Sequence, residues 1–168
     1  MRLLALAISA LLAISALLVG ATPALAGPAT VSVTVAPELQ KKFEKTYGPR
    51  EARLLTGDLQ ASVEKALART GAHEGARIEL ALMDVKPNRP TFKQLGDTPG
   101  LSLQSFGVGG AAIAGKVVAA DGTETPIRYH WYETDIEQAQ AHWVWTDAEF
   151  AFDRLARRLA KGEEVAVR

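Results

Sequence analysis

The stretch of chain that most constrains the fold covers residues 113–133. Two β-prone runs, 113–120 and 125–133, flank the dipeptide Asp121-Gly122. Asp-Gly between two such runs is the strongest short-range signal for a β-hairpin, because glycine readily adopts the positive φ that a tight turn requires. The sequence therefore predicts an antiparallel pair of strands joined at Gly122.

The second arm of this hairpin alternates, so that one face can pack on a core while the other meets water or a partner. The apolar positions are Ile127, Tyr129 and Trp131, and the polar positions are Arg128, His130 and Tyr132. A slip of one residue would bury an arginine and a histidine, so we expect a firm register. The polar face is either an ordinary solvated surface or a binding surface. Because exposed arginine and tyrosine are common interface anchors, Arg128, His130 and Tyr132 are the candidate binding residues.

Periodicity predicts most of the remaining elements. Strict alternation indicates strands over 31–35 and 77–85. An apolar residue at every fourth position from Leu55 to Leu67 indicates a helix over 50–70 whose stripe belongs to the core. Together with the hairpin and a final helix, these elements predict a single α+β domain: a mainly antiparallel sheet of about four strands with two main helices packed on one face.

The start of the final helix has a strong local signal. Thr146-Asp147-Ala148-Glu149 matches a capping box, in which the Thr146 hydroxyl would accept a hydrogen bond from the Glu149 amide. Trp145 and Phe150 are placed to form a hydrophobic staple around this box. Leu155 lies on the apolar stripe of the same helix, so we expect it to be buried.

Two segments lack regular periodicity. Residues 86–100 contain several prolines and glycines and are predicted to be a loop, with Phe92 and Leu95 holding it against the core. The glycine-rich run 106–111 lacks the Gly-Lys-Ser/Thr ending of a phosphate-binding loop and the third glycine of a dinucleotide fingerprint. We interpret that run as a β segment whose glycines permit a bulge or close packing.

Residues 1–26 are interpreted as a signal peptide. A short positive start precedes an apolar run over 3–19, and Ala24-Leu25-Ala26 is a small-x-small cleavage site before Gly27. We therefore expect export to the periplasm, with no membrane anchor after cleavage. The alternative is an uncleaved anchor in the inner membrane, because the apolar run lies at the short limit for crossing a bilayer, about 17 residues. The predicted organisation is then a signal peptide over 1–26, one α+β domain over 27–162 and a frayed tail over 163–168.

Composition excludes several functions. The chain has no cysteine, so it has no thiol nucleophile, no thiolate metal site and no cysteine for lipid attachment. Its 19 basic and 19 acidic residues balance, which argues against a nucleic-acid partner held by bulk charge.

No recognised catalytic signature is present. There is neither a Gly-x-Ser-x-Gly elbow nor a His-Glu-x-x-His motif. His130, Glu133, His142 and Asp147 could converge on a metal, but their spacing matches no known metal signature. We therefore predict no catalytic residues, no cofactor and no metal site.

The order of the elements resembles a known group of proteins. An Ala-Leu-Ala signal, a Val-x-Val strand, a long helix, an Ile-x-Leu-x-Leu-Met-Asp-Val strand, an Asp-Gly hairpin and a final helix occur in succession. This pattern is similar to small exported α+β proteins of Gram-negative bacteria, with an architecture like the N-terminal domain of TolB or the curli secretion lipoprotein. The absence of a lipid-attachment cysteine departs from the lipoprotein members.

These observations favour a non-enzymatic periplasmic binding module, or a cell-envelope accessory module, whose partner is an envelope protein. The alternative is a small metal-assisted or acid–base hydrolase that uses His130, His142 and nearby carboxylates. A structural subunit of an envelope assembly is the third class that fits.

Overall fold

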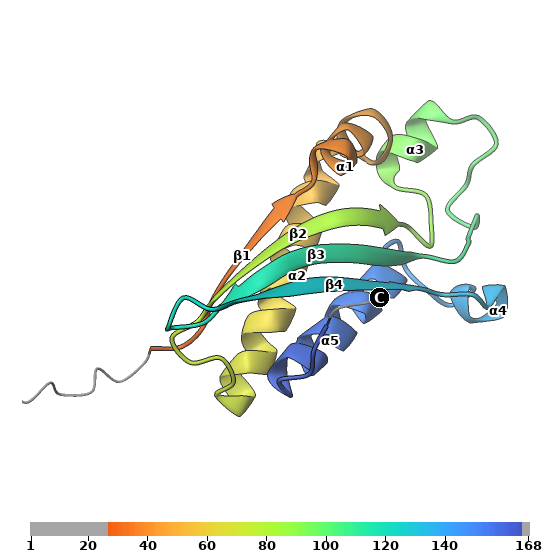
Figure 1. The fold of residues 1–168 in the computed structure, drawn as a ribbon. Coiled ribbons are helices and arrows are strands. Elements are labelled where there is room, and N and C mark those ends of the chain that lie inside the picture. The colour runs from red at the N-terminus through yellow and green to blue at the C-terminus, as the bar shows by residue number, and fades with distance from the viewer. Residues whose placement is uncertain (1–26, 166–168) are drawn as a thin grey trace, which may run out of the picture.

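The computed structural model describes residues 27–165, and within that range the chain forms a four-stranded sheet with helices packed on it (Figure 1). The signal peptide expected over 1–26 lies outside the described residues. Between residues 27 and 165, no helix is both long and apolar enough to cross a membrane.

The sheet has the strand order β1-β2-β3-β4. The strands are β1 (Thr30–Val35), β2 (Arg77–Lys86), β3 (Gly110–Val118) and β4 (Glu124–Tyr132). β1 and β2 are parallel, and the other two pairings are antiparallel. The parallel pair requires a long crossover, which the helical segment between β1 and β2 supplies. The predicted α+β class and the mainly antiparallel sheet are confirmed.

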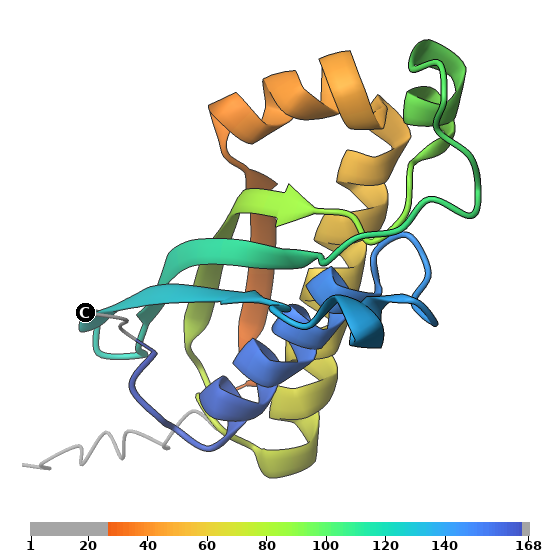
Figure 2. The ribbon, with the colours of Figure 1, turned by 90° about the vertical axis from the view of Figure 1, so that its right-hand side faces the viewer.

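Two long helices cover one face of this sheet and leave the other face open (Figures 1 and 2). The helical segments are α1 (Pro37–Lys42), a π-helical turn η1 (Phe43–Tyr47), α2 (Pro49–Thr70), α3 (Phe92–Asp97), α4 (Ile136–Ala139) and α5 (Thr146–Ala160). α2 and α5 pack against each other as well as against the sheet. Gly71 ends α2 in the left-handed conformation, at a φ of 67°, as expected for a helix stop.

The core fills the space between these two helices and the sheet. Leu59 of α2, Leu155 of α5 and Ile78 of β2 are fully buried at its centre. The apolar stripe predicted for each helix faces inward, so burial of the stripe holds the helices on the sheet.

The predicted capping box of α5 is wrong. A helix capped by Thr146 would begin at Asp147, but α5 begins at Thr146. The Glu149 amide donates to the carbonyl of Trp145 at 2.9 Å and not to the Thr146 hydroxyl. A distant side chain supplies the cap, because Asn88 Oδ1 accepts from the Asp147 amide at 2.9 Å. The Thr146 hydroxyl accepts from the Trp143 amide at 2.9 Å.

The hydrophobic staple also fails to form. Trp145 packs edge-on against Tyr47, with ring centroids 5.5 Å apart, while Phe150 contacts the rings of Trp131 and His142. Tertiary contacts therefore replace the local pairing that the sequence suggested.

The segment over 86–100 contains a short helix, α3, that sequence periodicity did not predict. Its capping box is complete: the Thr91 hydroxyl accepts from the Gln94 amide, and the Gln94 side chain accepts from the Thr91 amide. Phe92 was expected to hold the segment against the core, but 84% of its surface is exposed.

The tail beyond α5 is less frayed than expected. Val165 is buried, and its carbonyl accepts a hydrogen bond from the Arg128 amide at 2.7 Å. β4 is an edge strand with outward amides that need partners, and burial of the valine side chain adds to this contact. Residues 166–168 of the expected tail lie outside the described range.

Candidate functional site

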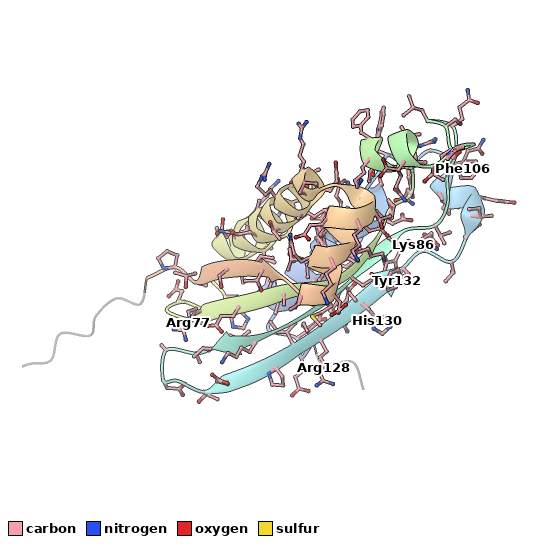
Figure 3. The ribbon with its side chains drawn as sticks, turned by 90° about the horizontal axis from the view of Figure 1, so that it is seen from above. Arg77, Lys86, Phe106, Arg128, His130 and Tyr132 are labelled. Carbon is pink, nitrogen blue, oxygen red and sulfur yellow. The ribbon has the colours of Figure 1, made fainter. Side chains whose placement is uncertain are left out.

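The three residues predicted as a binding surface lie in a row along β4, on the face that no helix covers (Figure 3). Arg128 and His130 are exposed and Tyr132 is half-buried. On the opposite face of the strand, Ile127 and Tyr129 are buried, as predicted, and Trp131 is only half-buried. The register is the one expected from the hairpin, since Tyr129 pairs with Ile113.

Tyr132 is not a free anchor, because its hydroxyl is tied into the fold. It donates to Asp84 Oδ2 at 2.8 Å, and Asp84 Oδ1 lies 3.1 Å from Lys42 Nζ. Burial and the bond to Asp84 raise the pKa of Tyr132 well above its usual range. The network depends on a bulge between Leu82 and Asp84, which shifts the β2–β3 register so that Asp84 pairs with Ala112.

A second surface, which the sequence reasoning missed, occupies the end of the molecule that carries α3 and α4 (Figure 1). Large apolar side chains are exposed there on the loops and on the first turns of α2. We call this surface the apolar loop end, and its residues are Phe92 (84% exposed), Trp143 (81%), Leu103 (68%), Leu54 (49%) and Phe106 (45%). Apart from Leu54, which lies in the predicted helix over 50–70, the only signal in the sequence was the presence of large apolar residues in segments without periodicity.

Two grooves run side by side across this surface. The smaller, of about 280 Å³, lies between Arg50 and Leu54 of α2 and the Phe92 side chain. The larger, of about 550 Å³, is lined by His142 and Trp143 together with Phe92. Both grooves also share Pro90, Leu103 and Val144 as walls. The surface can therefore receive two neighbouring apolar groups.

Arg89 holds the two loops of this surface together. Its guanidinium donates to the backbone carbonyls of Leu103, Gln140 and His142. The planar fork of arginine suits several carbonyls in one plane, whereas the point charge of lysine does not. The loops over 98–109 and 133–145 are thus fixed by a side chain distant from both in sequence.

Beneath the larger groove, the fully buried Asp147 organises three segments. Its Oδ2 accepts from the Asn88 side-chain amide and from the Gly109 amide, the latter at 2.8 Å. Its Oδ1 lies 2.9 Å from His142 Nδ1, but the two atoms are not oriented for a hydrogen bond. A buried carboxylate needs such partners, because an unpaired charge in the interior is costly. The Gly109 backbone also packs tightly against Asn88, where a Cβ would lie 2.9 Å from Oδ1.

The structure brings together only two of the four residues considered for a metal or acid–base site. His142 and Asp147 are adjacent, whereas His130 lies on the open face of β4. The Glu133 carboxylate accepts from the amides of Thr134 and Asp135 at 2.7 and 2.9 Å. Across residues 27–165, no three histidine or acidic side chains gather as a metal would require.

Comparison with known proteins adds no assignment. No protein-family model matches the chain, and no curated protein is significantly similar to it.

Proposed function

We propose that the protein is a non-enzymatic, exported binding module of the cell envelope, and that the apolar loop end is its main binding surface. The observation that carries the proposal is the exposure of Phe92, Leu103 and Trp143 around two connected grooves. Soluble monomers rarely expose a contiguous apolar patch of this kind without a binding role. The leader-like run over 1–26 supports export.

The groove residues favour a polypeptide segment that carries apolar side chains beside a carboxylate. Arg50 is exposed at the smaller groove and forms no ion pair within the described part of the chain. Glu51 also lines this groove, but its carboxylate accepts from the Trp145 indole at 2.7 Å and forms no ion pair with Arg50. Arg89 is likewise bonded only to neutral carbonyls. A ligand carboxylate would give Arg50 the anionic partner that it lacks within residues 27–165.

The two neighbouring grooves favour a ligand that carries two apolar groups on one polypeptide chain. Phe92 and Leu103 wall both grooves, so a ligand that fills the two must pass over these side chains. Successive apolar side chains of an envelope polypeptide meet that requirement, with aromatic or aliphatic groups as the anchors.

Short synthetic peptides test this function. The probe is a fluorescent peptide with two apolar residues and a free C-terminal carboxylate, compared with its amidated form. We expect Phe92→Ser and Trp143→Ser to weaken binding by about tenfold or more, which is about 1.4 kcal/mol. Ile136→Ser is the matched control, because Ile136 is 50% exposed on α4 and lines neither groove. Arg50→Gln should remove the preference for the free carboxylate.

Failure of both peptides to bind the wild-type protein would overturn the proposal. Equal weakening by Ile136→Ser would also overturn it, since the effect would then be general surface hydrophobicity.

The contact between His142 and Asp147 favours a second function, an acid–base hydrolase. With Nδ1 turned to a buried carboxylate, Nε2 is the ring nitrogen left to exchange a proton with a molecule in the larger groove. In this version His142 would be the base, Asp147 the positioning residue, and His130 uninvolved. Hydrolysis of p-nitrophenyl esters that is lost in His142→Ala and kept in His130→Ala would support it. Equal rates for both variants would exclude it.

A further inference from the structure

One face of α5 carries a cluster of cations. Arg154, Arg157, Arg158 and Lys161 follow the spacing i, i+3, i+4 and i+7, which places them together on one side of a helix. Like charges at this spacing repel each other. The helix dipole compensates for cations in the last turn, but Arg154 lies before that turn. Helix energetics alone therefore do not account for the whole cluster.

These cations surround a cleft rather than a flat surface. Together with Tyr129 of β4 they line a cleft of about 340 Å³, and none of the five lining residues is acidic. The Tyr129 ring is buried in the core at 8% exposure. Burial raises the pKa of Tyr129, although the charges of Arg154, Arg158 and Arg157 act in the opposite direction. Tyr129 is thus the one lining residue of this cleft that is not a cation.

Several of the cations are already held in place. The guanidinium of Arg154 lies over the Trp131 ring, 4.4 Å from the centroid. Arg158 Nε and Lys161 Nζ lie 3.2 and 3.7 Å from the Glu163 carboxylate. Glu163 therefore pairs with two of the four cations, while Arg157 also borders a neighbouring cleft that contains Asp58, Glu149 and Asp153. Arg157 forms no ion pair in the segment 27–165.

We propose that this cleft binds a phosphate group, carried either by a soluble phosphate ester or by a lipid headgroup. A phosphate dianion offers several acceptor oxygens, which match the forked donors of the arginines and the phenol of Tyr129. α5 runs away from α3 and α4, so this site lies apart from the apolar loop end (Figure 2). The proposal is therefore independent of the peptide-binding function.

Two probes identify the source of the phosphate. Inorganic pyrophosphate is titrated by calorimetry, and phosphatidylcholine vesicles with and without phosphatidic acid are tested by co-sedimentation. We expect saturable binding that Arg154→Gln/Arg157→Gln weakens by about tenfold, the equivalent of about 1.4 kcal/mol. Lys45→Gln/Arg53→Gln is the matched control, because it removes two exposed cations from η1 and α2. That control should change the affinity by less than about twofold, since exposed charges at a distance are screened by salt.

The outcomes are distinct. Binding of pyrophosphate alone supports a soluble ester, and binding of phosphatidic acid vesicles supports a headgroup. No saturable binding of either probe overturns the site, as does an equal loss in the control. The single variant Arg157→Gln separates loss of binding from misfolding, because it disturbs no ion pair within 27–165. It should weaken binding and leave the thermal unfolding temperature unchanged.

Discussion

The carboxylate of Asp147 lies 2.9 Å from Nδ1 of His142, in a position where the acid is fully buried. Asp147 opens α5, whereas His142 belongs to the loop that carries Trp143 and one wall of the larger groove. The contact therefore places α5 beside the loop that forms one wall of the proposed binding surface.

Replacement of Asp147 by asparagine should destabilise the protein by about 1–3 kcal/mol, because hydrogen bonds to a neutral amide oxygen are weaker than those to a charged carboxylate. Asn88 and the Gly109 amide both donate to Asp147 Oδ2 in the native structure. Urea unfolding measures the loss. Asp97→Asn is the control: its exposed pair with Lys93 should contribute less than about 1 kcal/mol. Equal stability of Asp147→Asn and wild type would contradict the role given to the buried carboxylate.

The sequence predicted the fold well because the signals for it are local. Alternation in β4 and the four-residue spacing in α2 depend only on which residues face the core, and both elements form as expected. The cap of α5 was mispredicted for a related reason. Thr146 and Glu149 matched a local pattern, but Asn88, far away in the chain, supplies the bond.

The apolar loop end could not be predicted by the same reasoning. It exists because Arg89 bonds to carbonyls in two loops that have no periodicity. No rule of spacing relates residue 89 to residue 140. On the open face, Arg128 and His130 were correctly expected to be exposed, but the bulge beside Asp84 that captures Tyr132 leaves no clear pattern in the sequence.

Two substitutions in α5 compare core packing with a single local hydrogen bond. Leu155→Ala should cost about 2–5 kcal/mol, because Leu155 is fully buried between α5 and the sheet. Thr146→Ala should cost only about 0.5–1.5 kcal/mol, the net contribution of the hydrogen bond from the Trp143 amide. Denaturant unfolding of both variants provides the measurement. A larger loss for Thr146→Ala than for Leu155→Ala would refute this order.

Two glycines should respond in opposite directions to alanine. At Gly115 in β3, a Cβ would overlap the carbonyl oxygen of Glu79 on the neighbouring strand, so Gly115→Ala should destabilise the sheet by about 1–3 kcal/mol. At Gly57, inside α2, a Cβ would meet nothing within 4 Å. Gly57→Ala should therefore stabilise the protein by about 0.5–1 kcal/mol. Thermal unfolding of the two variants measures both effects. A Gly115→Ala variant that is more stable than the wild type would contradict the close contact between β2 and β3.

The stability of the protein should fall in alkaline solution partly because of Tyr132. Burial and the hydrogen bond to Asp84 raise the pKa of Tyr132, so the folded state holds the phenol proton more tightly than the unfolded state does. The stabilisation is fully present below about pH 10, the usual value for tyrosine, and is lost as the pH rises from there through the folded-state pKa. Tyr132→Phe removes this proton, so its unfolding free energy should decline less steeply above pH 10 than that of the wild type. Urea unfolding at a series of alkaline pH values measures both slopes. Identical slopes would show that Tyr132 ionises as freely in the folded protein as in the unfolded chain, which would contradict the role given to its burial and its bond to Asp84.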